Sequence, residues 1–475
     1  MNKNKELVKN TAIISIGKIC TQFLSFLLLP LYTSLLTTKD YGTVDLITTY
    51  QQLLGYIVFF QIEQAVFRFL IDVRNDKDKY RQKKIISSVV AFAIFQTVVL
   101  CIILFAISTF INFNYLRELC LYCVATVYSG LMLQVVRGLG QNSLYALGSF
   151  ISAACTILFN IVFLVAFNFG AEGMLYSFIL GNLICSMFLF IKAKVYCYID
   201  LRCFSKQSVK ECLKYSLPLV PNALSWWIMG ASDRTIVSYI MGTAANGLLS
   251  VSHKFSSAYT TFYTVFNLSW TESASLHFHD EDHEIFFESV ISKVYRLFSA
   301  ACLGIIALMP LVFPILINAN YSDAYYQIPI YMVAALFNVI QGLYSVIYVA
   351  LKKTKEIAKT TVVSALINIA VNLLLINYIG LYAASISSLV AYAVNCIWRY
   401  IDLKKYMNVP LSKKLIFSTL IMLMIVCVPY YLKLFIGQCI GLFLVILYAA
   451  YINRDIILVI FKSPKNFRNS FTKRK

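Results

Sequence analysis

The sequence predicts an all-α protein whose chain crosses a membrane about fourteen times. Of its 475 residues, 60% are hydrophobic and only 13% are charged, whereas charged residues make up about a quarter of a soluble globular domain. Apolar stretches of about twenty residues, the length of one membrane-spanning helix, follow one another along almost the whole chain. Lys and Arg are concentrated in every second gap between these stretches, as expected when cytoplasmic loops retain positive charge.

The N-terminal segment predicts the first of these helices. Its first ten residues, MNKNKELVKN, are basic. The apolar run behind them is longer than the core of a signal peptide, and no small-x-small cleavage site follows it. We therefore expect this run to remain in the protein as a membrane helix.

The thirteen cysteines predict neither a disulfide framework nor a metal centre. Most of them lie within or at the ends of apolar stretches, where a thiol serves as a small apolar side chain. Cys120 and Cys123 form one C-x-x-C, but a metal site needs more ligands than these two. We expect no cofactor and no bound metal.

Fourteen helices account for the apolar stretches when about twenty residues are assigned to each span. The predicted ranges are Thr11–Leu36, Thr43–Leu70, Ile85–Phe110, Glu118–Val136, Ser143–Phe167, Met174–Ile191, Leu217–Met241, Leu248–Ser275, Ser289–Ile317, Ile328–Leu351, Ile357–Ile376, Leu381–Tyr400, Leu415–Tyr431 and Ile436–Phe461.

The positive charges orient these helices. With the N-terminus inside, the inner segments and the adjoining inner ends of the spans hold 34 of the 41 Lys and Arg residues, and the outer loops hold Lys39, Arg117 and Lys433. A miscounted helix would mix the two groups, so the bias favours fourteen spans with both termini in the cytoplasm. It also accounts for the net charge of +19 without nucleic acid as a partner.

One inner loop, residues 277–284, is acidic and contains three histidines. Its Asp280-Glu281-Asp282 matches the D-x-D of metal-dependent glycosyltransferases, and His and carboxylate side chains together can bind a divalent metal. No soluble domain is present to build a nucleotide-sugar site around the loop, so a solvated acidic loop is the favoured interpretation.

Two turns indicate an internal duplication. The turn at Gly42 (LTTKDYGTVDL) matches the turn at Gly247 (MGTAANGLLSV) with an offset of 205, and the turn at Gly170 matches the turn at Gly380 with an offset of 210. Both matches skip six helices, so the halves would share one orientation, as in transporters built from parallel repeats. We predict an N-lobe over residues 1–205, a C-lobe over 206–408, and a final helix pair with a basic cytoplasmic tail over 409–475.

Two segments resemble a known family. The first predicted helix and turn read SFLLLPLYTSLLTTKDYGTVDLITTY, with an apolar run that contains Pro and a Gly that closes a short outer turn. Ala365 to Val390 read ALINIAVNLLLINYIGLYAASISSLV, with spaced Asn residues before Leu-rich sequence, Gly and small residues. Both are similar to segments of the polysaccharide flippases of the multidrug/oligosaccharidyl-lipid/polysaccharide exporter superfamily, and the resemblance in helix number and repeat covers nearly the whole chain.

This resemblance implies a multi-pass protein of the bacterial cytoplasmic membrane that is not an enzyme. Its expected activity is to flip undecaprenyl-diphosphate-linked oligosaccharide from the inner to the outer leaflet, by alternating access between the two lobes. Its partners would be that lipid-linked diphosphate and membrane lipid. The last helix pair resembles an added pair that offers a groove to the lipid tail, which is an argument by analogy.

Four of the cations within predicted spans are the candidates for binding the diphosphate: Lys18, Arg68, Arg234 and Lys254. Buried cations should face the bundle interior or a wet cavity. Arg234 and Lys254 flank the Gly242–Gly247 turn at a shared depth of roughly 10 Å, although an Asp233–Lys254 ion pair is an alternative. Lys18 could instead extend to the inner headgroups, and Arg68 could meet lipid phosphates or water.

The energy source is expected to be an ion gradient, because no P-loop is present. Four carboxylates within spans could bind a sodium ion or proton: Asp45, Glu63, Asp233 and Glu272. Each could equally be the structural partner of a nearby cation.

Two other functions remain open at this stage. A drug or metabolite exporter of the same superfamily would have the same helices and a soluble, often cationic substrate. A membrane glycosyltransferase or polymerase would typically carry catalytic acids on a large outer loop, and the predicted outer loops are short. The sequence does not identify the sugar.

Overall fold

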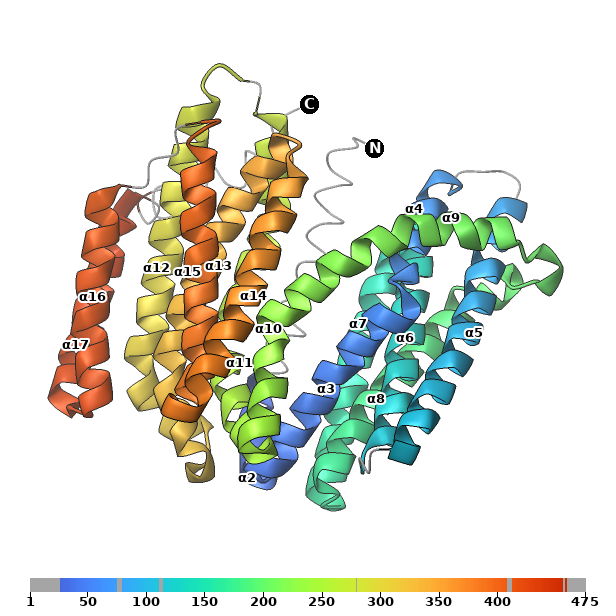
Figure 1. Cartoon of the computed structure of the whole chain (residues 1–475), viewed down its shortest axis with the longest axis horizontal. Helices are drawn as coiled ribbons and strands as arrows, with labels where there is room; N and C mark the ends of the chain where they lie inside the picture. The colour runs from blue at the N-terminus through green and yellow to red at the C-terminus, as the bar shows by residue number, and fades with distance from the viewer. Residues whose placement is uncertain are drawn as a thin grey trace. The chain divides into compact units, whose positions relative to one another are not determined.

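Helices form all the regular secondary structure in the residues that the computed structural model describes, which are 26–74, 79–110, 114–278, 280–407, 412–455 and 458 (Figure 1). The chain divides into two compact units. Unit 1 comprises Met1–Lys254 and Asn368–Ala384, and unit 2 comprises Phe255–Ile367 and Ser385–Lys475. The division into lobes at residues 205 and 408 stays a prediction.

Unit 1 is built mainly from the N-terminal half of the chain. Its helices are α2 (Leu29–Leu35), α3 (Thr38–Phe59), α4 (Ile62–Asp72), α5 (Tyr80–Phe110), α6 (Leu116–Gly138), α7 (Asn142–Ile161) with its π-helical extension η1 (Val162–Ala166), α8 (Gly170–Lys192), the 3-10 turns η2 (Val195–Tyr198) and η3 (Leu201–Cys203), α9 (Lys206–Ser216), the 3-10 turn η4 (Leu217–Leu219) and α10 (Val220–Met241).

Unit 2 contains most of the C-terminal half. The long helix α11 (Thr243–Leu276) begins in unit 1 and continues into unit 2. The remaining elements are α12 (His283–Leu316), the 3-10 segment η5 (Ala319–Gln327), α13 (Ile328–Ala350), α14 (Thr354–Ile379), α15 (Tyr382–Leu403), α16 (Lys413–Leu432) and α17 (Phe435–Ile452). The end of α14 and the start of α15 belong to unit 1.

The helices agree broadly with the predicted spans. Within the described residues, nine helices are long and apolar enough to cross a membrane, and α3 with α4 forms a tenth when they are counted as one bent span. Three further long helices, α10, α11 and α15, are less apolar. They carry buried polar groups, such as Asp233, Asn246 and Arg399, and so form polar parts of the interior.

The second predicted span is not one continuous helix, as the sequence suggested. It is divided into α3 and α4, which meet at an angle of 56°, and Phe60 and Gln61 at the break have positive φ angles of 52° and 51°. A side chain replaces one helical hydrogen bond lost there, since Gln96 Nε2 donates to Val58 O at 2.8 Å. The side chain of Gln61 also joins the break to η4, because its Nε2 donates to Leu219 O at 3.1 Å. A break inside a membrane is stable when protein groups satisfy the freed backbone.

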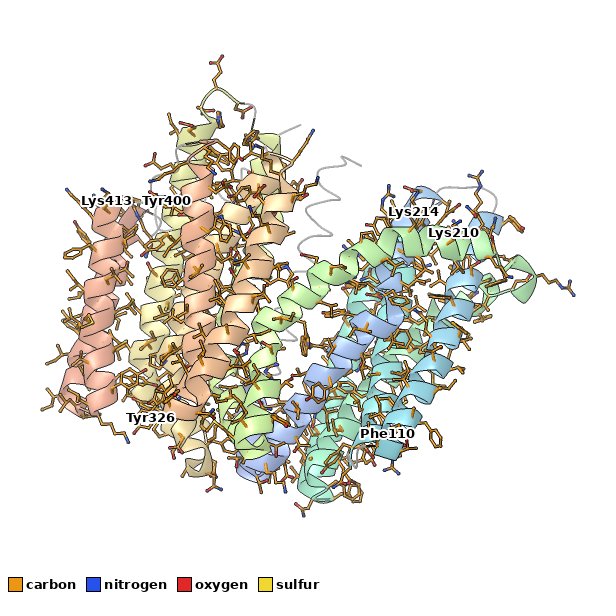
Figure 2. All side chains as sticks on the ribbon, in the orientation of Figure 1. Phe110, Lys210, Lys214, Tyr326, Tyr400 and Lys413 are labelled. Atoms are coloured by element: carbon orange, nitrogen blue, oxygen red, sulfur yellow. The ribbon has the colours of Figure 1, made fainter. Side chains whose placement is uncertain are left out.

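An amphipathic helix that the sequence analysis did not predict, α9, lies at one end of unit 1. The Ser205 hydroxyl caps its N-terminus, and its buried residues, including Val209 and Cys212, face α4 and α5. Lys210 and Lys214 are exposed on α9, and Phe110 lies at the opposite end of the unit (Figure 2). This basic helix occupies the segment that the charge bias places in the cytoplasm.

Unit 2 contains a completely buried arginine. Arg399, on α15, is 0% exposed and donates to hydroxyls on α14, at 3.0 Å to both Thr360 Oγ1 and Thr361 Oγ1. It also donates to Gln341 O at 3.1 Å and to the side chains of Gln341 and Ser345 on α13. One guanidinium therefore joins three helices, and its five donors suit such branched bonding.

Replacing this arginine should weaken unit 2. Arg399→Leu removes the only charged donor from these contacts and leaves buried oxygens to find other partners, at an expected cost of about 2–4 kcal/mol. The thermal unfolding midpoint of the purified protein in detergent should fall clearly. The same change at the exposed Arg202 is the control, and equal midpoints for the two variants would contradict a joining role for Arg399.

Candidate functional site

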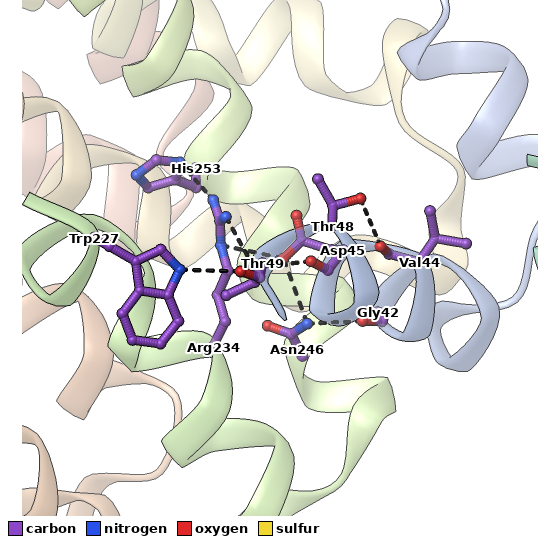
Figure 3. A network of polar contacts seen from close by, with 9 residues as sticks. All are labelled: Gly42, Val44, Asp45, Thr48, Thr49, Trp227, Arg234, Asn246 and His253. Atoms are coloured by element: carbon purple, nitrogen blue, oxygen red, sulfur yellow. Dashed lines mark hydrogen bonds and ion pairs between the residues drawn. The ribbon is translucent and has the colours of Figure 1, made fainter. Parts of the chain in front are cut away.

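An ion pair between α3 and α10 lies at the centre of the candidate site in unit 1. Arg234 Nε is 3.1 Å from Asp45 Oδ2, and the two side chains are only 17% and 16% exposed (Figure 3). Arg234 was predicted to bind the substrate and Asp45 to bind the coupling ion. The structure pairs them with each other, and a charged pair shielded from water is held much more firmly than one on the surface.

Neighbouring polar groups fix both partners of this pair. Arg234 Nη1 lies 3.4 Å from Thr49 Oγ1, and Nη2 lies 3.3 Å from His253 Nδ1 on α11. Trp227 Nε1 donates to Thr49 O at 3.0 Å, so α10 contacts α3 at two successive levels. Figure 3 shows these side chains converging from α3, α10 and α11.

Lys254, the second predicted substrate cation, lies on α11 next to His253. It is partly buried and interacts electrostatically with Asp45 and Arg234. Among the described residues, no hydrogen bond or ion pair fixes its ammonium group. Since Arg234 already neutralises Asp45, the positive charge of Lys254 is not balanced within the cluster. A bound anion would neutralise it.

Asp233 forms a separate site on a different side of α10 from the ion pair, facing α14. It is 6% exposed and accepts a hydrogen bond from Asn372 Nδ2 on α14 at 2.8 Å. Asn368 lies one turn before Asn372 on α14, and its Oδ1 accepts a hydrogen bond from Ser232 Oγ at 3.1 Å. Asn372 is 0% exposed, and its Oδ1 has no hydrogen-bond partner among the described residues. A carboxylate, amide oxygens and a hydroxyl thus lie together.

The other predicted residues lie apart from these two groups. Arg68 forms an exposed ion pair with Asp72 within α4. Glu63 is in the first turn of α4, where the free backbone N–H groups stabilise a carboxylate. Glu272 is exposed on the part of α11 that belongs to unit 2, and Lys18 lies outside the described residues.

The acidic loop after α11 provides no metal centre in its described part. The described residues of the chain contain no group of three or more His, Cys, Asp or Glu side chains that could hold a metal ion. His277 Nδ1 contacts Ser273 O at 2.9 Å and His283 Nδ1 contacts Asp280 O at 2.8 Å. Both rings thus bond to local backbone, and His279 lies outside the described residues.

Sequence reasoning missed three functional candidates, namely Asn246, His253 and Asn372. Two are amides and one is an imidazole, and a search for Lys, Arg, Asp and Glu within spans passed over them. The signal that could have found Asn372 is its place in the series of spaced Asn residues on α14, four residues after Asn368. Two polar amides four apart lie on one helical face, and that face meets Asp233.

The fold is similar to that of solved multi-helix membrane transporters. The chain is similar to the solved structure of the lipid II flippase MurJ in an inward closed conformation, with 16% identity and a TM-score of 0.71 over 95% of this chain and 100% of that one. It is also similar to an inward-facing multidrug resistance MATE family transporter of the MOP superfamily, with 16% identity and a TM-score of 0.67 over 83% and 100% of the two chains. The predicted all-α membrane fold is confirmed.

The family follows from the sequence itself. Residues 7–270 match the model of the family described as "Polysaccharide biosynthesis protein". This match covers more than half of the chain, so the chain belongs to that family. No curated protein sequence matches it.

The Asp45–Arg234 pair should show strong energetic coupling. Asp45→Asn and Arg234→Gln should each lower stability, and the double variant should cost less than the sum by about 1–3 kcal/mol, as for bonds between charged groups shielded from water. Thermal unfolding of the four proteins in detergent measures this coupling. The exposed Arg68–Asp72 pair, treated in the same way, is the control and should show no measurable coupling.

Proposed function

We propose that this protein flips undecaprenyl-diphosphate-linked oligosaccharide from the inner to the outer leaflet of the bacterial cytoplasmic membrane by alternating access. Membership of the polysaccharide biosynthesis family supports a substrate made of lipid-linked sugar. The fold it shares with a lipid II flippase supports movement of such a substrate across the bilayer. The observation that carries the proposal is the ammonium of Lys254 beside the Asp45–Arg234 pair, which no hydrogen bond or ion pair from the described part of the chain engages.

The charge of this cluster favours an anionic substrate over a cationic drug or metabolite. A diphosphate would accept hydrogen bonds from Lys254 and, after rearrangement, from the outer edge of the Arg234 guanidinium. His253 lies beside both and could contribute a further donor. A cationic substrate would instead face the positive charge of Lys254, so the exporter alternative lacks a matching site in this cluster.

An apolar pocket in unit 2 supports a substrate with a lipid tail. It has a volume of about 250 Å³ and lies among α12, α13, α15 and α16. Its walls include Leu336, Ile340 and Leu423, and Lys413 lies at its edge. One wall of the pocket is α16, the first helix of the predicted final pair. The apolar lining of the pocket suits a hydrocarbon chain.

Loss of the Lys254 charge should abolish transport. The variant Lys254→Gln is expressed in cells that lack the chromosomal gene and any second flippase. Labelled lipid-linked oligosaccharide should accumulate on the inner leaflet of these cells, and its rate of appearance on the outer leaflet should fall at least about tenfold. Lys254→Arg, which keeps the charge, should retain part of the activity.

The matched control is Lys405→Gln, which removes an exposed lysine that pairs with Asp402. It should transport normally. Normal transport by Lys254→Gln at normal protein levels would remove Lys254 from the site. Normal outer-leaflet delivery in cells without the gene would overturn the proposed function itself.

We further propose that Asp233 holds the coupling ion and that this ion is sodium. The oxygens of Asp233, Asn372, Asn368 and Ser232 are hard ligands of the kind that bind sodium. No described residue donates a hydrogen bond to Asn372 Oδ1, which leaves that oxygen available to an ion. A proton would need only the carboxylate. The other three carboxylates lack such a set, since Asp45 is paired, Glu63 is at a helix start and Glu272 is exposed.

Sodium should therefore stabilise the protein through this site. Adding sodium in place of potassium should raise the unfolding midpoint of the parent protein, and Asp233→Asn or Asn372→Ala should remove most of this increase. Glu272→Gln should leave it intact. A transport rate that depends on pH and not on sodium, with no sodium stabilisation of the parent, would identify the proton as the ion.

A further inference from the structure

Two glycines bring the beginnings of α3 and α11 into direct backbone contact. Gly42 and Gly247 are each the fifth residue of their helix. A Cβ atom on Gly42 would lie 1.8 Å from Thr243 O and 2.6 Å from Gly247 N, and a Cβ atom on Gly247 would lie 2.0 Å from Thr38 O. No side chain larger than hydrogen fits at either position, so the helices touch as closely as their backbones allow.

This contact is reciprocal. Each glycine faces the carbonyl oxygen of the first residue of the other helix, Thr243 for Gly42 and Thr38 for Gly247. The two glycines and the two threonines differ by the same 205 positions, which is the offset of the predicted duplication. Contact between equivalent surfaces is what a two-fold axis produces, so the two halves of the chain meet here through equivalent residues.

One buried amide holds the contact together. Asn246, which is 0% exposed, donates from Nδ2 to Gly42 O at 2.8 Å and lies 3.5 Å from Asp45 Oδ2. The bond to Gly42 O depends on the close approach that the glycines permit. It also connects the contact to the Asp45–Arg234 pair, about one helical turn along α3 (Figure 3).

We propose that Gly42, Gly247 and Asn246 form the outer closure of the transport path. The charge bias places both helix starts at the outer face, where a backbone contact without interlocking side chains can seal the path and separate again with little repacking. Opening breaks the Asn246 bond to Gly42 O. This inference rests on the proposed alternating access and extends it, because it names the contact that must open. All three are positioning residues that do not touch the substrate.

Outside accessibility of Ser250 tests the closure. Ser250 is 2% exposed, lies one turn beyond Asn246 on α11, and corresponds to Asp45 in the duplication. In spheroplasts that carry Ser250→Cys, a membrane-impermeant maleimide is added from outside, and labelling at position 250 is quantified by peptide mass spectrometry. Adding Gly42→Ala or Asn246→Ala should raise this labelling about tenfold, because the closed state loses its contact.

Gly230→Ala on α10 is the matched control, since a Cβ atom there would meet nothing within 4 Å from the described residues beyond its own stretch of helix. It should leave the labelling low. Unchanged labelling in both Gly42→Ala and Asn246→Ala, at normal levels of folded protein, overturns the closure. The measurement needs no substrate, so raised labelling in a protein that moves no lipid-linked oligosaccharide would sustain the closure and refute the proposed substrate.

Discussion

Asp45 and Arg234 hold α3 against α10 through a bond between charged groups that water scarcely reaches. In a bilayer, a charge that faces lipid is costly, so each charged side chain within a span needs a partner inside the protein. Thr49 and His253 contact Arg234, and Trp227 donates to the Thr49 carbonyl, so these three side chains gather around the pair. The polar interior of unit 1 is organised around it, and Arg399 has the corresponding place in unit 2.

Consecutive residues of α10 serve two different sites. Arg234 faces α3 and α11, whereas Asp233 faces α14, because neighbouring residues of a helix point about 100° apart. A rotation or shift of α10 would therefore change the anion site and the carboxylate site together. A single rigid helix can in this way couple two binding events without a chain of side chains between them.

The sequence predicted the spans, their charge bias and the polar residues in them, because these follow from local composition. Arg234 and Asp45 were each predicted to bind a ligand, whereas they form an ion pair with each other. The sequence could not show this, because the partner of a side chain depends on which helices are neighbours in the fold. The α3–α4 break was missed because neither Phe60 nor Gln61 is a helix-breaking residue such as Gly or Pro. The broken conformation is stabilised by Gln96, which lies on another helix. Arg399 was counted with the inner charges because it lies near the end of its span.

The break between α3 and α4 also bears on how the chain assembles in the membrane. Val58 O is satisfied by Gln96, which belongs to α5 and follows it in synthesis. Before α5 arrives, a continuous helix is the favoured form of this segment, because an unpaired carbonyl in hydrocarbon costs several kcal/mol. The bend therefore belongs to the assembled helix pair, and we expect the segment to insert as a straight helix and to bend once α5 is in place.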